Sequence, residues 1–182
     1  SASIVIYKTL IDEIGIDSIS PKIVMGHSLG EYSALVANNV LSLFDASILI
    51  KKRGDLMNSA IEPNLSGMVA IIGKNSEFIE NIINKNNLKI QIANDNSPMQ
   101  VVVSGLMIDI DKAENFFISQ GVKRYLKLNV SAAFHSKYML DAQEKLNNEI
   151  DKTTFLSTNI PIISNFNASI NLKKNDIIYS LK

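Results

Sequence analysis

The stretch from residue 24 to residue 31 constrains this chain more than any other. It reads Val-Met-Gly-His-Ser-Leu-Gly-Glu and contains the pattern Gly-x-Ser-x-Gly, centred on Ser28. A short apolar run precedes the pattern and apolar residues at helical spacing follow it, which predicts a strand that turns sharply into a helix. Such a turn strains the serine backbone and exposes the hydroxyl. Ser28 is therefore the candidate nucleophile.

The residues beside Ser28 fit the same interpretation. Glycine is expected at positions 26 and 30 because a Cβ at either one would collide with the neighbouring backbone. The N–H of Leu29, at the start of the helix, would lie where negative charge develops on an attacked carbonyl. The alternative is a serine that only caps the helix.

Composition excludes several classes of function. The chain has 182 residues, with 18 basic and 18 acidic side chains and no dense basic run, so no nucleic-acid partner is expected. It has no cysteine and only two histidines, which argues against a disulfide framework or a zinc site. No apolar run reaches the roughly 18 residues of a membrane span, and no secretory signal is evident. We expect no membrane association and a cytoplasmic location.

Periodicity and chain-breaking residues predict an α/β protein. Helices are predicted at 2–14, 29–39, 44–60, 76–86, 109–120, from about 135 to 150, and 175–182. Strands are predicted at 23–25, 68–72, 89–93, 100–104, 123–128 and 160–163, with a turn at 94–98. The order strand, helix, strand, strand, helix, strand predicts a ferredoxin-like (βαββαβ) small domain over 64–128. Because the nucleophile follows only one helix and one strand, we expect a segment that lacks its N-terminal beginning. The helix predicted at 175–182 stops mid-pattern, so we expect the C-terminal end to be missing as well.

Two further side chains are candidates for chemistry. Arg53 lies on an apolar helix stripe, four residues from both Leu49 and Met57. It could extend to solvent or pair with a carboxylate, or its guanidinium could receive a substrate carboxylate. His135 could be a structural residue or the base that activates Ser28.

Several motifs in the same order resemble those of the malonyl-CoA:acyl-carrier-protein transacylases and the related acyltransferase domains of fatty-acid and polyketide synthases. The motifs are Gly-His-Ser-Leu-Gly-Glu-Tyr-Ser-Ala at 26–34, Lys-Arg-Gly at 52–54, Ala-Asn-Asp-Asn-Ser-Pro-Met-Gln-Val-Val at 93–102, Val-Ser with Phe-His-Ser at 130–136, and Pro-Ile-Ile-Ser-Asn at 161–165. The resemblance extends along nearly the whole chain.

The resemblance implies an α/β-hydrolase-like large domain (1–63 and 129–182, incomplete at both ends) with the ferredoxin-like domain inserted at 64–128, and an active site between them. It implies a ping-pong reaction in which a serine takes a malonyl group from coenzyme A and passes it to the phosphopantetheine thiol of acyl carrier protein. Malonyl-CoA and acyl carrier protein are then the partners. The coenzyme A thioester is a substrate, no metal or permanently bound cofactor is implied, and we expect a monomer.

Matching to the family pattern also implies roles for individual residues. Ser28 is the nucleophile, His135 the base, the Leu29 N–H an oxyanion donor and Arg53 the clamp for the malonyl carboxylate. Substrate-binding roles are implied for Met57, Asn96, Phe134 and His27. The family's upstream glutamine motif and its motifs beyond the last strand are absent from this sequence. Three alternatives remain: a polyketide-synthase acyltransferase domain, a serine esterase or thioesterase, and a catalytically silent module that binds carrier protein.

Overall fold

The computed structural model describes residues 2–182 and has an α/β fold built from eight α-helices and seven strands within that range. Its contacts divide the chain into two compact units. Unit 1 is Ser1–Arg53 together with Lys145–Lys182, and unit 2 is Gly54–Glu144. Two helices, α4 (Leu43–Ser59) and α7 (Leu140–Lys152), contribute residues to both units.

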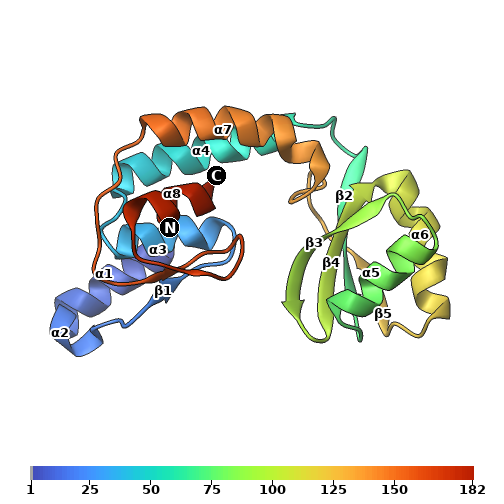
Figure 1. Ribbon diagram of the computed structural model, residues 1–182, viewed down its shortest axis with the longest axis horizontal. Coiled ribbons are helices and arrows are strands. Elements are labelled where there is room, and N and C mark those ends of the chain that lie inside the picture. The colour runs from blue at the N-terminus through green and yellow to red at the C-terminus, as the bar shows by residue number, and fades with distance from the viewer. Residues whose placement is uncertain (1) are drawn as a thin grey trace. The chain divides into compact units, whose positions relative to one another are not determined.

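Unit 1 packs helices around a small mixed sheet (Figure 1). Besides its parts of α4 and α7, it contains α1 (Ala2–Ile14), α2 (Ile16–Ile19), β1 (Val24–Met25), α3 (Leu29–Ala37), β6 (Ile162–Ile163), β7 (Ile170–Asn171) and α8 (Lys174–Leu181). The strand order is β1-β6-β7. β1 pairs with β6 in parallel, with Val24 opposite Ile162 and Met25 opposite Ile163, and β7 pairs with β6 antiparallel.

The core of unit 1 lies where α3 packs against the strands and the neighbouring helices. Its fully buried members include Leu35, Val40, Leu41, Leu49, Phe155, Ile162 and Ile177. Asn38, at the C-terminal end of α3, is buried and donates its side-chain N–H to the Ile160 carbonyl oxygen at 2.8 Å. The same amide accepts the Thr158 hydroxyl at 2.9 Å, so the end of α3 is tied to the segment that leads into β6.

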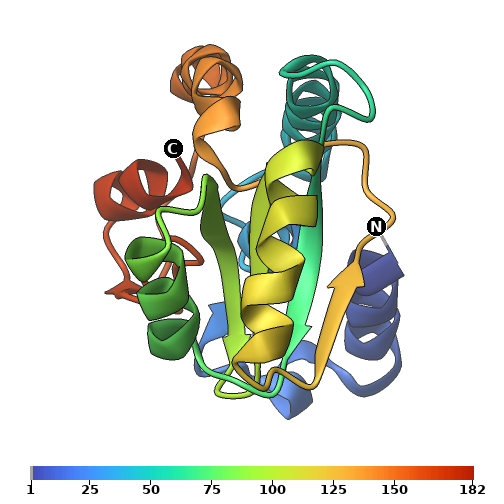
Figure 2. The ribbon, with the colours of Figure 1, turned by 90° about the vertical axis from the view of Figure 1, so that its right-hand side faces the viewer.

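Unit 2 contains a four-stranded antiparallel sheet with two helices over one face (Figure 2). Its elements are β2 (Ser66–Ile72), α5 (Ser76–Lys85), β3 (Ile90–Ser97), β4 (Gln100–Leu106), α6 (Met107–Ser119), β5 (Arg124–Lys127) and the 3₁₀ turn η1 (Lys137–Met139). The strand order is β3-β4-β2-β5. Alternate residues of the central strands β2 and β4, such as Val69, Ile71, Val101 and Val103, are fully buried beneath α5 and α6.

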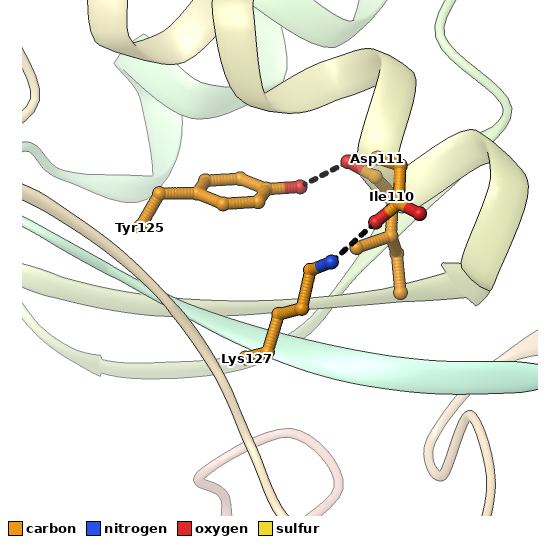
Figure 3. A network of polar contacts seen from close by, with 4 residues as sticks. All are labelled: Ile110, Asp111, Tyr125 and Lys127. Atoms are coloured by element: carbon orange, nitrogen blue, oxygen red, sulfur yellow. Dashed lines mark hydrogen bonds and ion pairs between the residues drawn. The ribbon is translucent and has the colours of Figure 1, made fainter. Parts of the chain in front are cut away.

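Helix α6 is fastened to the edge strand β5 by one buried and one exposed interaction (Figure 3). The Tyr125 hydroxyl donates to the Ile110 carbonyl oxygen at 2.8 Å, and the Tyr125 ring stacks on Phe117 at 5.8 Å between centroids. Burial raises the pKa of the Tyr125 hydroxyl well above its usual value, so it stays a neutral donor. The exposed Lys127–Asp111 ion pair adds little, because water screens it.

Most predicted elements are confirmed. The predicted capping serine also forms, since the Ser42 hydroxyl accepts the Asp45 N–H at 2.9 Å at the start of α4. The predicted turn at 94–98 is wrong: β3 continues to Ser97 with two register shifts, so these polar residues form an irregular strand end. Strand β7 was not predicted. Among the described residues no helix is long and apolar enough to cross a membrane.

Candidate active site

The Gly-x-Ser-x-Gly stretch forms the predicted strand–turn–helix. Ser28 lies between β1 and α3 at the N-cap position, with φ 50° and ψ −110°. A positive φ in a non-glycine residue costs about 1–3 kcal/mol and persists only where surrounding contacts hold it. Two backbone bonds close the turn: Gly30 N–H donates to the His27 oxygen at 2.8 Å, and Glu31 N–H donates to the Ser28 oxygen at 3.1 Å.

The two glycines of the motif do not have the same role. A Cβ on Gly26 would lie 2.1 Å from the carbonyl carbon and oxygen of Gly30, so β1 and the first turn of α3 approach too closely for any side chain. A Cβ on Gly30 would meet no heavy atom within 4 Å outside its own helix backbone and chain neighbours. The expectation of a collision at both positions is therefore correct for Gly26 and wrong for Gly30, which already belongs to the helix.

The Ser28 hydroxyl faces Arg53 rather than capping α3. The Arg53 Nη2 atom donates to Ser28 Oγ at 2.9 Å, and the serine side chain makes no capping hydrogen bond. Arg53 is half-buried, so its charge is not simply extended into solvent. The alternative of a serine that only caps the helix is thus not supported, and the predicted proximity of Arg53 to the candidate nucleophile is observed within unit 1.

Asn165 is a contact of the nucleophile that sequence analysis missed. Its Oδ1 atom accepts the Ser28 N–H at 2.9 Å, and its own N–H donates to Glu31 Oε2 at 3.4 Å. Sequence analysis quoted Asn165 only as part of a family motif. A signal was present, because the residue directly follows the predicted strand at 160–163, and parallel strands bring their carboxyl ends to one edge of a sheet.

Burial controls the charges around the turn. The Glu31 side chain is only 5% exposed, and this burial raises the pKa of its carboxyl from 4.5 to about 7, while the hydrogen bond from the Asn165 backbone acts in the opposite direction. Burial likewise raises the pKa of Tyr32 to about 12. The nearby Arg53 charge acts to lower this pKa, and the Glu31 charge acts to raise it. Arg53 is the charged side chain whose hydrogen bond reaches the Ser28 hydroxyl itself.

His135 lies on a well-anchored segment of unit 2. The buried Ala133 N–H donates to the Ser66 hydroxyl at 2.9 Å, and the Lys137 N–H donates to Gln91 Oε1 at 3.1 Å. Between these anchors His135 has φ 54°, which excludes it from a helix. The predicted helix from about residue 135 therefore begins too early, since η1 begins only at Lys137 and α7 at Leu140. His135, the predicted base, lies instead in the connection that precedes η1, with a positive φ.

The other predicted substrate-binding residues are spread over both units. His27 is exposed beside Ser28 in unit 1, whereas Met57, Asn96 and Phe134 belong to unit 2. Phe134 is half-buried and packs on the sheet face that carries Met68, Ala70 and Val102.

Leu29 is the first residue of α3, so its N–H is one of the helix-start amides without an intrahelical acceptor. Within residues 2–182, no three His, Asp or Glu side chains lie together to hold a metal ion.

A model of the acyl transferase domain family matches residues 2–176. The chain belongs to this family. The malonyl CoA-acyl carrier protein transacylase of Bacillus subtilis is 40% identical to it over 163 residues, which cover 87% of this chain and 51% of the relative. The match thus includes the serine turn, Arg53 and the His135 segment.

Solved structures of the family have the same fold. The malonyl CoA-acyl carrier protein transacylase from Coxiella burnetii superposes with a TM-score of 0.92 at 34% identity, covering 99% of this chain and 57% of that one. A malonyl-transacylase solved in complex with its type II polyketide-synthase acyl carrier protein gives a TM-score of 0.91 at 31% identity, covering 99% and 58%. This member of the acyl transferase family spans about half the length of the malonyl CoA-acyl carrier protein transacylases that it matches.

The two motif glycines provide a matched test of the turn. We expect Gly26→Ala to lower the free energy of unfolding by about 3 kcal/mol, because the new methyl group overlaps backbone that cannot move aside. Gly30→Ala should raise it by up to about 1 kcal/mol, since alanine favours the helix and meets open space. Urea denaturation of both variants measures the difference. Equal losses would contradict this account of the turn.

The buried carboxyl of Glu31 predicts a pH-dependent stability. Its folded pKa of about 7 exceeds the ordinary 4.5, so the folded state binds the extra proton between these values and loses stability as pH rises from about 4.5 to 7. We expect Glu31→Gln to remove this loss and to gain on the order of 2 kcal/mol on the unsubstituted chain across that range. Denaturation from pH 4.5 to 8 tests this; parallel profiles would refute it.

Proposed function

We propose that this chain carries the catalytic serine of a malonyl transferase. The reaction moves a malonyl group from coenzyme A to the phosphopantetheine thiol of acyl carrier protein through an acyl-enzyme on Ser28, in fatty-acid biosynthesis. The Arg53–Ser28 contact carries this proposal. A guanidinium hydrogen-bonded to the nucleophile's oxygen at 2.9 Å is placed to bind a carboxylate that arrives with the reacting carbonyl.

The residues would act in two mirrored half-reactions. Ser28 Oγ attacks the thioester carbon as His135 accepts the hydroxyl proton, and the Leu29 N–H donates to the developing oxyanion. The carbon–sulfur bond then breaks, and the coenzyme A thiolate takes the proton from His135. In the second half the carrier's thiol gives its proton to His135, its sulfur attacks the acyl-serine, and the proton returns to Ser28. Arg53 binds the malonyl carboxylate throughout.

The division into a ferredoxin-like and an α/β-hydrolase-like domain is part of the same proposal. The order β2-α5-β3-β4-α6-β5 and the strand order β3-β4-β2-β5 support a ferredoxin-like small domain at 64–128. The parallel pairing of β1 with β6, and the sharp turn after β1, support an α/β-hydrolase-like domain at 1–63 and 129–182. We propose that Met57, Asn96, Phe134 and His27 bind substrate and that His135 is the base.

The carrier protein is the proposed partner. A structural neighbour of this chain was solved with its acyl carrier protein, which supports a carrier as the acceptor. That carrier belongs to a polyketide synthase, so a role in polyketide supply is the second candidate. Transfer rates to the two kinds of carrier distinguish these roles. Faster transfer to a fatty-acid acyl carrier protein favours fatty-acid biosynthesis, and faster transfer to a polyketide-synthase carrier favours polyketide supply.

Two other functions are less well supported. A serine esterase or thioesterase would share the turn, but a neutral ester gives Arg53 no carboxylate to bind. A silent module that only binds carrier would not need the strained Ser28 backbone. A transferase should retain a serine-linked malonyl group until a thiol acceptor arrives, whereas a hydrolase would release it to water.

Acyl loading tests the assignment of Ser28. Incubation with malonyl-CoA should add one malonyl mass to the chain, with the adduct on the peptide that contains Ser28, and Ser28→Ala should abolish it. Ser47→Ala, which changes an exposed serine of α4, should load normally. Intact-protein and peptide mass spectrometry provide the measurement. An adduct that persists in Ser28→Ala, or no adduct on the unsubstituted chain, would refute the proposal.

Acyl preference tests the role of Arg53. Arg53→Ala should lower the ratio of malonyl to acetyl loading roughly a hundredfold, about 3 kcal/mol, because a bidentate charged contact is lost. Lys52→Ala, which removes the neighbouring exposed charge, is the matched control and should leave the ratio unchanged. Competition between malonyl-CoA and acetyl-CoA measures both. An unaltered ratio in Arg53→Ala would rule out the clamp.

A further inference from the structure

Ser28 and Asn165 are 137 positions apart and meet because two short strands run side by side. β1 ends at Met25 and its parallel partner β6 ends at Ile163, directly opposite. The chain therefore leaves both strands at the same edge of the sheet, and the turn that carries Ser28 lies against the loop that begins at Ser164.

The contacts between these two segments form a closed circuit. The Ser28 N–H donates to Asn165 Oδ1, and the Asn165 N–H donates to Glu31 Oε2. The Glu31 N–H donates back to the Ser28 carbonyl oxygen at 3.1 Å. Both backbone polar groups of Ser28 are thus held, one by the side chain of Asn165 and the other through the helix that carries Glu31.

The circuit acts where the backbone is strained. With φ at 50°, Ser28 would relax toward an ordinary conformation unless its N–H and C=O were fixed. The loop itself is well ordered by local bonds: Ser164, buried, donates its N–H to the Ser169 oxygen and accepts the Ala168 N–H. The backbone that precedes Asn165 is therefore held by local hydrogen bonds, and the exposed Asn165 side chain reaches Ser28 from it.

We propose that Asn165 is a positioning residue for the nucleophile. Its side-chain oxygen holds the Ser28 N–H and so maintains the conformation in which the hydroxyl is presented, while Glu31 orients the Asn165 backbone. The effect on acyl transfer rests on the proposed function. The effect on the Ser28 backbone does not, and the two are measured separately.

Hydrogen exchange of the Ser28 amide reads the contact directly. Asn165→Ala should raise the exchange rate of this amide at least tenfold, because its acceptor is gone. Asn167→Ala is the matched control: Asn167 is an exposed asparagine of the same loop whose Oδ1 accepts the Ser169 N–H, so a similar local bond is lost away from Ser28. It should leave Ser28 exchange unchanged. Unchanged Ser28 exchange in Asn165→Ala would overturn the proposal.

The rate of acyl loading measures how the loss of the Asn165 contact affects the reactivity of Ser28. Asn165→Ala should slow serine malonylation by about ten- to a hundredfold in kcat with little change in KM, because the serine, not the substrate site, is displaced. Asn165→Asp keeps an acceptor oxygen in place and should restore Ser28 amide protection. It should recover only part of the loading rate, since its negative charge lies near the developing oxyanion.

The outcomes distinguish the two proposals. Wild-type loading by Asn165→Ala, or a loss equalled by Asn167→Ala, would overturn the positioning role even if Ser28 is the acylated residue. Failure of the unsubstituted chain to load would refute the proposed function instead, and the exchange comparison would still decide whether Asn165 holds the Ser28 backbone.

Discussion

The parallel pairing of β1 with β6 is the constraint on which the nucleophile depends. Only two residue pairs form it, yet it brings the turn at Ser28 and the loop at Asn165 to one edge of the sheet. It also fixes the direction in which α3 leaves the sheet, and Gly26 allows the close approach that follows. A weak ladder is sufficient because the buried residues of α3, Leu35 and Val36, anchor the helix in the core of unit 1.

The energies involved are of similar size, which explains why several contacts converge on one residue. The strained Ser28 backbone costs about 1–3 kcal/mol. Each intramolecular hydrogen bond returns about 0.5–1.5 kcal/mol. One bond would not hold the conformation, but the three bonds that link Ser28, Glu31 and Asn165 together match the cost. The 3.4 Å bond to Glu31 is the weakest of them, so the Ser28–Asn165 bond matters most.

Local patterns predicted most of the elements, and tertiary contacts explain what they missed. Apolar spacing located α5 and α6, because each buries one stripe: Ile79 and Ile82 in α5, and Ile110, Ala113 and Phe117 in α6. Apolar spacing placed the start of a helix near His135, but this residue has a positive φ and is not helical. Apolar spacing also did not predict β7, a two-residue strand that is defined by its pairing with β6. The Gly-x-Ser-x-Gly motif located the strand–turn–helix at Ser28, and Arg53 contacts this serine. The motif could not reveal Asn165, whose role depends on a neighbour 137 residues away, nor the freedom at Gly30.

The backbone N–H of Ser28 already donates a hydrogen bond within the protein. In many serine enzymes the nucleophile's own N–H helps to neutralise the tetrahedral intermediate. Here the Ser28 N–H donates to Asn165 Oδ1, whereas the Leu29 N–H lies at the free start of α3 without an intrahelical acceptor. In the proposed reaction, the contribution of the turn to charge neutralisation would then come from the start of α3.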